Sequence, residues 1–204
     1  FTATIPSGTN QIDFEFIVGT ATDDDGNTSE FGIMTIICNT PQNLAYSNVT
    51  SSSVNLSWNA EDTANNGYEY VVMLSGESPN TANAIETGTI ANETSVSVTG
   101  LTSSTAYDAY VRSVCSDSDN SGWSDEVSFN TLPSLNTQDI SVQLNSAGQA
   151  NIEPLDVFDD SDGNLPDNHI LTLDISTFDC NDIGQNTVTL TLEDNFENTT
   201  SETA

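Results

Sequence analysis

Residues 53–58 read Ser-Val-Asn-Leu-Ser-Trp, so that Val54, Leu56 and Trp58 alternate with polar residues. Successive side chains of a strand point to opposite faces, and this pattern therefore predicts a β-strand with one face in a core. Clusters of Gly, Asn and Asp separate similar runs elsewhere in the chain. Many short strands at such spacing are typical of β-sandwiches, and an all-β fold is predicted. The other alternating runs are residues 12–16, 70–74, 96–98, 107–111, 127–129, 140–144 and 188–192.

The charge of the chain limits its partners. The 204 residues include 31 acidic side chains against one basic side chain, for a net charge of −30. Nucleic acids and anionic membrane surfaces are excluded as partners, because both are bound by clusters of Lys and Arg. Metal cations are the natural counter-charge. No run of about 18 apolar residues is present, so no membrane insertion is expected.

Prolines indicate two module boundaries. Pro41 follows an apolar strand predicted at residues 33–37, and Pro133 follows a strand that ends near Thr131. Proline has no N–H to donate to a β-ladder, and both positions therefore suit junctions between modules. The predicted modules are residues 1–37, 38–132 and 133–204.

The two outer modules contain an internal repeat. Residues 8–29 and 184–201 both contain a Gly, an alternating strand, an acidic turn and an Asn-Thr pair. The first copy continues into a last strand at residues 31–37. The second copy reaches Ala204 where the corresponding strand is expected to begin. The chain is therefore expected to hold the C-terminal part of one repeat and a second repeat that lacks its last strand.

The middle module contains several motifs of one family. They are Pro41-Gln42-Asn43-Leu44, Val54-Asn55-Leu56-Ser57-Trp58, Tyr68-Glu69-Tyr70-Val71-Val72 and the spacing of Leu101, Thr105 and Tyr107. Together these motifs resemble a fibronectin type III domain over residues 38–132. The flanking modules resemble Ig-like or hyalin-type repeats, and the whole arrangement is similar to Bacteroidetes secreted or surface multidomain adhesin-like proteins. The resemblance implies tandem Ig-like β-sandwiches with a central fibronectin type III domain.

The resemblance also implies a disulfide. Cys38 just before the first strand and Cys115 at the end of a Val-Arg-x-Val-Cys strand fit a pattern of the same Bacteroidetes modules. A Cys38–Cys115 disulfide is expected, with two buried thiols as the alternative. A disulfide implies an oxidising compartment, so the expected location is extracellular or at the cell surface. Cys180 lacks the partner usual in these repeats and is expected to be unpaired or to pair outside this chain.

Two acidic loops are candidate metal sites. Ca²⁺ is bound by about six to eight oxygen atoms, which short loops of Asp, Asn and backbone carbonyls supply. Calcium is therefore the cofactor expected for these loops. Neither loop matches the EF-hand pattern, and the alternative is a solvated turn stabilised by Asx hydrogen bonds. The candidate ligands are Asp23, Asp25 and Asn27 in the first loop and Asp159, Asp160, Asp162 and Asn164 in the second.

No catalytic residues are predicted, and the chain is not expected to be an enzyme. His169 is the only histidine, and no Gly-x-Ser-x-Gly motif is present to form a catalytic triad with it. Arg112 alternates with core residues, so it is expected to point outward and pair with a carboxylate on the neighbouring strand. Asp62-Thr63-Ala64 resembles the Bacteroidetes O-glycosylation motif, which implies a modified Thr63.

The leading hypothesis is a structural or adhesive segment of a large secreted or cell-surface protein or extracellular filament, which acts as a stiff modular spacer. The alternative is a set of accessory carbohydrate- or partner-binding modules of a secreted hydrolase. The expected partners are neighbouring modules of the same protein, like subunits, and surface glycans. A third hypothesis is strand exchange, in which residues 31–37 of one chain complete the open repeat ending at Ala204 in another.

Overall fold

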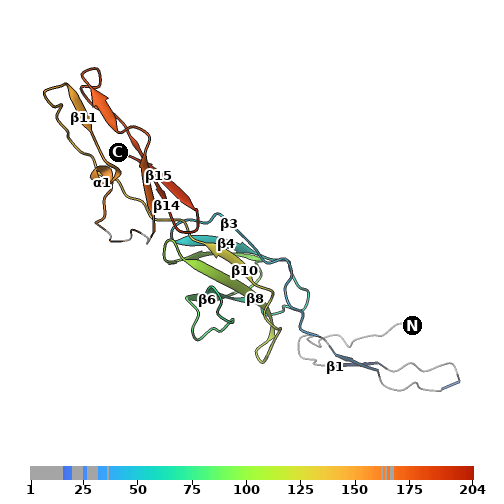
Figure 1. The fold of residues 1–204 in the computed structure, drawn as a ribbon. Helices are drawn as coiled ribbons and strands as arrows, with labels where there is room; N and C mark the ends of the chain where they lie inside the picture. The colour runs from blue at the N-terminus through green and yellow to red at the C-terminus, as the bar shows by residue number, and fades with distance from the viewer. Residues whose placement is uncertain are drawn as a thin grey trace.

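A computed structural model of the chain describes residues 16–19, 25–26, 32–35, 37–161, 163, 165 and 168–204. In this part of the chain every regular element is a strand except one four-residue helix, so the predicted all-β fold is confirmed. Figure 1 shows these elements following one another along an elongated molecule. No helix of the described residues has the length and apolar character needed to cross a bilayer.

The N-terminal end of the molecule is a two-stranded ribbon. β1 (Phe16–Gly19) pairs antiparallel with β2 (Gly32–Thr35), and Phe16 lies opposite Thr35. The ribbon forms a sheet of its own, and no further described strand extends it. In Figure 1 it lies at the end of the molecule opposite to β11 and β15.

The central module consists of two antiparallel sheets. The first has the strand order β3-β4-β7, and the second has the order β10-β8-β5-β6, with β9 paired to the end of β8. The strands of the first sheet are β3 (Ala45–Ser47), β4 (Ser53–Ser57) and β7 (Ser95–Thr99). Those of the second are β5 (Tyr68–Leu74), β6 (Glu86–Ile90), β8 (Ala106–Ser116), β9 (Asp119–Asn120) and β10 (Val127–Asn130).

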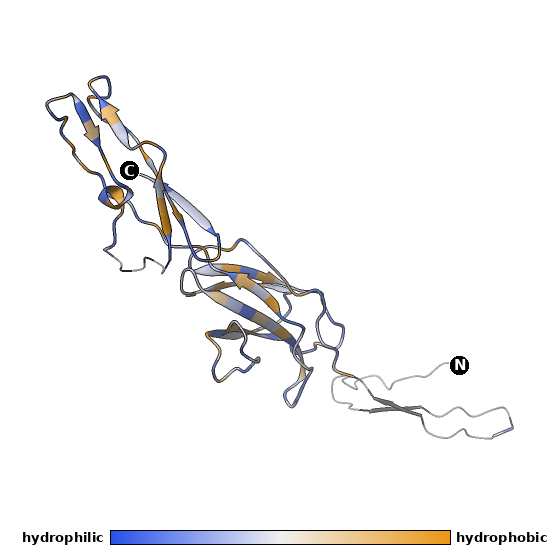
Figure 2. Ribbon diagram, in the orientation of Figure 1, coloured by the Kyte–Doolittle hydropathy of each residue, from blue (hydrophilic) through white to orange (hydrophobic). Residues whose placement is uncertain are grey.

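The core of this module lies between the two sheets and follows the alternation of the sequence. Val54 and Leu56 on β4 are fully buried, and they face Tyr107 and Val111 on β8. Trp58 packs edge-on against Tyr68 with ring centroids 5.5 Å apart. Figure 2 shows apolar and polar residues alternating along these strands, as expected for strands that bury one face.

The strand β8 departs from simple alternation, because both of its faces are covered. Asp108 and Tyr110 on its outer face are only 3% and 7% exposed. Tyr110 forms a second, smaller apolar cluster with Val71 and Met73, against which Trp123 packs. The segment between β9 and β10 covers this face, which the alternating pattern did not predict.

The C-terminal module has two small sheets and its own core. β11 pairs with β13, and β14 lies between β12 and β15. The elements are β11 (Gln149–Asn151), α1 (Pro154–Val157), β12 (Ile170–Leu173), β13 (Thr177–Asp179), β14 (Thr189–Glu193) and β15 (Thr199–Thr203). The buried residues are Leu135, Ile152, Val157, Phe158, Val188, Leu190 and Leu192.

Two features of this module differ from the sequence predictions. Residues 140–144 belong to no strand, although their apolar residues alternate. Residues 199–203, which the repeat comparison placed in the polar segment before the last strand, themselves form β15 against β14. The turn between these strands is fixed by the buried Asp194, whose carboxylate accepts hydrogen bonds from the backbone N–H groups of Phe196 (2.9 Å) and Asn198 (3.0 Å). This turn starts the returning strand at Thr199.

Candidate functional site

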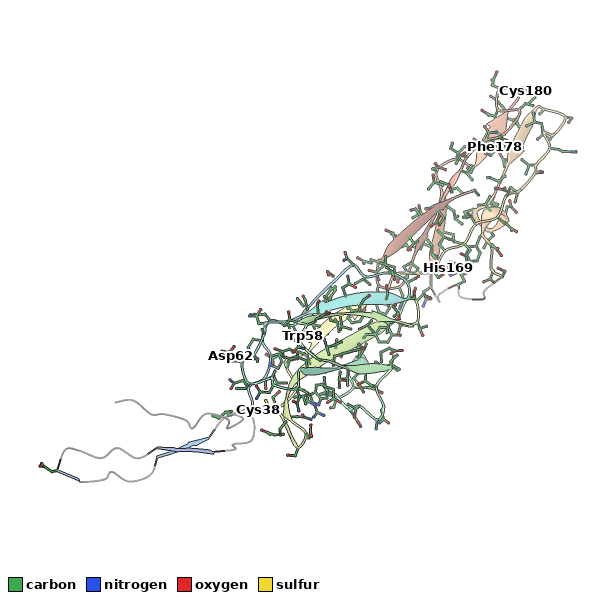
Figure 3. The ribbon with its side chains drawn as sticks, turned by 180° about the vertical axis from the view of Figure 1, so that it is seen from behind. Cys38, Trp58, Asp62, His169, Phe178 and Cys180 are labelled. Carbon is green, nitrogen blue, oxygen red and sulfur yellow. A yellow bond between two sulfur atoms is a disulfide. The ribbon has the colours of Figure 1, made fainter. Side chains whose placement is uncertain are left out.

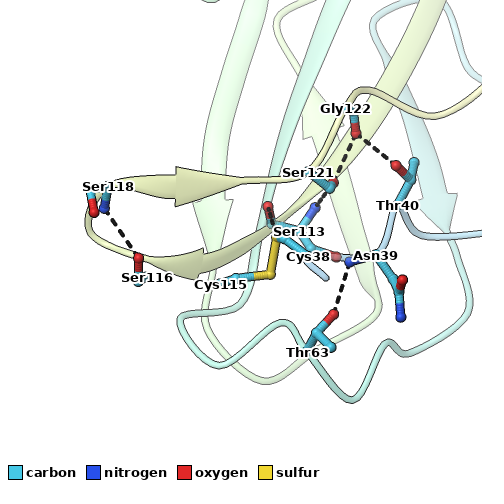
Figure 4. The surroundings of a disulfide bond; sticks show 10 residues. All are labelled: Cys38, Asn39, Thr40, Thr63, Ser113, Cys115, Ser116, Ser118, Ser121 and Gly122. Carbon is cyan, nitrogen blue, oxygen red and sulfur yellow. Dashed lines mark hydrogen bonds between the residues drawn. A yellow bond between two sulfur atoms is a disulfide. The ribbon is translucent and has the colours of Figure 1, made fainter. Parts of the chain in front are cut away.

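The disulfide lies at the start of the central module. Cys38 and Cys115 are joined across 77 positions with their Cα atoms 5.8 Å apart, so the expected disulfide is present in the structure. Figure 4 shows that it ties the segment entering the module to the end of β8. Next to it, the Asn39 N–H donates a hydrogen bond to Thr63 Oγ1 (3.0 Å), and Thr40 Oγ1 donates to the Gly122 carbonyl (3.2 Å). These contacts hold the entry segment against two loops.

Thr63, the residue implied as a glycosylation site, is half-buried beside the disulfide. Its hydroxyl oxygen already accepts the hydrogen bond from Asn39. The neighbouring Asp62 is exposed. Glycosylation of Thr63 stays a prediction.

The single basic side chain of the protein is held on the outer face of β8. Arg112 lies opposite Glu69 on β5, and its Nε donates a hydrogen bond to Glu69 Oε2 at 2.6 Å. The guanidinium carbon also lies 4.4 Å from the ring centroid of Trp123, a cation–π distance. The predicted pairing with a neighbouring carboxylate is therefore confirmed. The side chains of Arg112 and Glu69 are both partly buried, so this ion pair is interpreted as a contact that stabilises the fold.

Two further polar groups on this face stabilise loops of the module. Asp108 accepts a hydrogen bond from the backbone N–H of Gly76 at 2.7 Å, which fixes the turn after β5. Tyr110 donates to Glu126 Oε2 at 3.1 Å. Burial, this hydrogen bond and the nearby carboxylates raise the pKa of Tyr110 to about 12.

The candidate calcium ligands fall only partly within the described residues. Asp25 is exposed, whereas Asp23 and Asn27 of the same loop lie outside the described residues. In the second loop, Asp159 Oδ1 accepts the N–H of Ser161 (2.9 Å) and the Asp160 carbonyl accepts the N–H of Gly163 (3.2 Å), a compact Asx turn. Asp162 and Asn164 lie outside the described residues. Among the residues that the structure describes, no group of three or more His, Cys, Asp or Glu side chains is placed to hold a metal. Calcium binding stays a prediction.

Histidine and cysteine are not brought together. His169 is half-buried just before β12, and Cys180 is an exposed free cysteine after β13. Figure 3 shows His169, Cys38 and Cys180 in three separate regions of the molecule. A cysteine–histidine pair of the kind that activates a nucleophile is therefore not assembled by these residues.

The joint between the central and C-terminal modules contains no free linker. Thr131 Oγ1 donates to the Thr102 carbonyl (2.6 Å), and the Leu132 N–H donates to the Thr50 carbonyl (3.0 Å), so both residues belong to the central module. Pro133 is buried, and its carbonyl accepts a hydrogen bond from Thr200 Oγ1 (3.0 Å) on β15. Leu135 is already part of the C-terminal core. Only Ser134 thus lies between the bound Pro133 and the buried Leu135.

An open groove lies in the C-terminal module. Its volume is about 770 Å³. Its lining includes two segments, residues 139–144 and residues 182–187, which are called its walls here, together with Ala150, Ile152 and Val157. Ile140, Val142 and Ile183 on these walls are 37%, 50% and 79% exposed. The alternation of apolar residues in the first wall had predicted a strand there, but residues 140–144 belong to no strand.

A family model described as "Fibronectin type III domain" matches residues 39–130. Among solved structures, the chicken CNTN1 FN1–FN3 domains match with 16% identity and a TM-score of 0.42, over 57% of this chain and 40% of that chain. The FN5 domain of Drosophila Lar matches with 19% identity and a TM-score of 0.37, over 47% of this chain and 98% of that chain. A computationally redesigned β-sandwich protein matches with 16% identity and a TM-score of 0.40, over 47% of this chain and 97% of that chain. The search of curated proteins found no match.

Proposed function

We propose that this chain, whose residues 39–130 are a fibronectin type III domain, is a structural or adhesive segment of a large secreted or cell-surface protein and acts as a stiff modular spacer. Fibronectin type III domains are generally non-catalytic modules of extracellular proteins, and a disulfide within the chain suits an oxidising compartment. The observation that supports the spacer role most strongly is the joint between the modules.

This joint leaves little room for the modules to move independently. Domains connected by polar or glycine-rich linkers with few crossing contacts are expected to move relative to each other. Here Leu132 and Leu135 are held by different modules with only two residues between them. A hollow of about 290 Å³ beside the joint is lined by Tyr46 and Phe129 of the central module and Asn198 of the C-terminal module. Residues of both modules therefore line one hollow beside the connecting chain.

Inserting Gly-Ser-Gly-Ser between Leu132 and Pro133 should make the joint flexible, because the inserted residues have no partners in either module. Small-angle X-ray scattering would detect this as a broader distribution of interatomic distances than in the parent chain. The same insertion between Pro79 and Asn80, in the exposed loop after β5, is the control and should leave the distribution almost unchanged. A parent chain already as broad as the joint variant would contradict the spacer proposal.

Calcium is proposed as a stabilising ligand of the acidic loops. A ligand that binds only the folded state stabilises it by about 2.7 kcal/mol at one hundred times its Kd. Adding a chelator should therefore lower the melting temperature, and the combined substitution Asp159→Asn and Asp160→Asn should reduce that effect. Asp139→Asn, another exposed carboxylate of the same module, serves as the control. A melting temperature that does not respond to chelator would remove calcium from the proposal.

Accessory binding modules of a hydrolase remain the alternative role. Sugar-binding sites commonly use exposed aromatic rings as platforms, but Trp58 is buried in the central core. Trp123 has one face covered by the Arg112 guanidinium and packs against the second apolar cluster. The two tryptophans of the chain therefore favour the spacer over a glycan-binding role.

A further inference from the structure

The first sheet of the central module, β3-β4-β7, has an outer face without charge. The segments from Phe31 to Ala60 and from Thr94 to Tyr107 contain no charged residue, and the three strands lie within them. The chain as a whole has a net charge of −30. A second copy can therefore approach this sheet without placing carboxylates against carboxylates. The outward residues of β4 and β7 are Ser53, Asn55, Ser57, Ser95, Ser97 and Thr99.

The strand β7 is an open edge of this sheet. It pairs with β4 on one side, and no strand in the described part of the chain pairs with its other side. The Trp58 N–H donates to the Thr94 carbonyl (2.9 Å), which shows that the even-numbered residues direct their backbone groups toward β4. Because these directions alternate along a strand, Ser95, Ser97 and Thr99 direct theirs away from the sheet.

This edge lacks the devices that usually prevent strands from pairing with other molecules. Such devices are charged side chains, prolines, bulges and very short strands. β7 has five residues of the sequence Ser-Val-Ser-Val-Thr, and its register with β4 is unbroken. All three residues with outward backbone groups are exposed. β7 is therefore a template on which another uncharged strand can pair.

The edges β3, β10 and β6 of the same module are less suited to such pairing. β3 and β10 border one seam of the sandwich, where the rings of Tyr46 and Phe129 lie 5.7 Å apart. Asn198 of the C-terminal module lines the hollow beside them. β6 begins with the acidic Glu86 and has at its centre Gly88, against which the Tyr70 ring packs. The free, uncharged edge is thus β7.

We propose that β7 pairs antiparallel with β7 of a second copy of this chain, so that the two three-stranded sheets join into one. The strand matches itself when Ser97 lies opposite Ser97 of the second copy, because Ser95 then faces Thr99 of that copy. Each such pair exchanges two backbone hydrogen bonds. On the inner face the half-buried Val96 would lie beside Val98 of the second copy, which covers it further.

This contact gives a closed dimer that forms at high concentration. An interface in which both copies use the same surface is two-fold symmetric and closes on itself, so no filament results. One added ladder is small compared with the roughly 800 Å² that each partner buries in a stable complex. Glu86 and Glu93 lie near the ends of the strand, and their repulsion should weaken as salt is added.

The proposal goes beyond the spacer function, because it joins two spacers side by side through their central modules. The two proposals fail separately. Modules that turn independently within the monomer would contradict the spacer, whereas a chain that never pairs would contradict the dimer.

Trapping with an introduced thiol tests the register of the pairing. The background is Cys180→Ser, which removes the free cysteine and leaves Cys38 and Cys115 in their disulfide. Ser97→Cys should give a covalent dimer with oxidised glutathione, because the two Cα atoms would lie about 5.5 Å apart, within the usual range of disulfides. Non-reducing electrophoresis measures the dimer. Ser95→Cys is the matched control, since its two copies would lie about 13 Å apart along the strands.

Sedimentation velocity measures the pairing without a cross-link. The parent chain in reducing buffer should rise from its 21.7 kDa monomer mass toward twice that mass with concentration, more strongly at high salt. Ser97→Glu and Ser97→Lys should each abolish the rise, because like charges would meet on the symmetry axis. A mixture of the two variants should restore it. Ser57→Glu and Ser57→Lys, on the same face but on the central strand β4, should leave the rise unchanged.

Three results would overturn the proposal. The first is a parent chain that stays monomeric at every concentration and salt. The second is equal trapping of Ser95→Cys and Ser97→Cys, which would indicate random collisions. The third is a dimer that persists in both Ser97→Glu and Ser97→Lys and therefore forms through another surface.

Discussion

Replacing Cys38 and Cys115 together by serine should lower the free energy of unfolding of the central module by about 4 kcal/mol. The disulfide closes a loop of 77 positions, and cross-linking a loop of this length removes much of the conformational freedom of the unfolded chain. Urea denaturation followed by tryptophan fluorescence reports on this module, because Trp58 and Trp123 both lie in it. Such a loss is a large part of the stability of an ordinary domain.

Cys180→Ser provides the matched control for the disulfide. This cysteine is exposed and free, so its replacement should leave the denaturation midpoint of the central module unchanged. Reduction of the parent protein should reproduce the loss seen in the double variant. A double variant within about 1 kcal/mol of the parent would show that the entry segment is held by its hydrogen bonds and contributes little through the disulfide.

Leu56→Ala should strongly destabilise the central module, at a cost of about 2–5 kcal/mol. Leu56 is fully buried at the centre of β4, where it pairs with Tyr46 on β3 and Val96 on β7. Truncation removes buried methyl groups and leaves a cavity that a sheet paired on both sides closes poorly. The same denaturation experiment measures the effect.

Leu74→Ala is the control for the core prediction. Leu74 also lies on a strand of the central module, but its side chain is 41% exposed. Its truncation should change the free energy of unfolding by well under half of the Leu56 effect. Equal effects at the two positions would contradict the assignment of Leu56 to the inner face of the sandwich.

Much of the central module was predictable from the sequence because its strands bury one face. The period of two in Val54, Leu56 and Trp58 reports directly which side chains enter the core. The pairing of Arg112 with Glu69 was predictable for a similar reason, since an outward side chain on a central strand meets its neighbours across the ladder.

Alternation fails where a loop covers the outer face of a strand. Asp108 and Tyr110 occupy outward positions on β8 and are nevertheless buried. Their burial depends on Trp123 and on the turn at Gly76, which are distant in sequence. Local patterns carry no information on such tertiary contacts.

The C-terminal module shows the second limit of sequence patterns. Residues 140–144 alternate as a strand does, yet they pair with no neighbour. Alternation specifies which side chains prefer burial, whereas pairing depends on whether a partner strand is available. Likewise, the start of β15 is set by the turn that Asp194 caps, which a comparison of repeat lengths did not locate.

The joint was predicted only as a boundary. The sequence around Pro133 gave no sign that the flanking residues are held on both sides. Leu135 belongs to the second core, and the Pro133 carbonyl is bound by Thr200, a residue 67 positions later. The rigidity expected of this joint therefore depends on contacts between residues far apart in the sequence, which a local pattern does not reveal.

The central claim, that the two modules behave as one rigid unit, is tested most directly by ¹⁵N relaxation in dilute solution on the parent chain. The account predicts that amides in residues 45–130 and 149–203 share a single anisotropic rotational diffusion tensor. Separate and shorter correlation times for the two modules would mean that they turn independently, and the chain would then be a flexible string of domains instead of a stiff spacer.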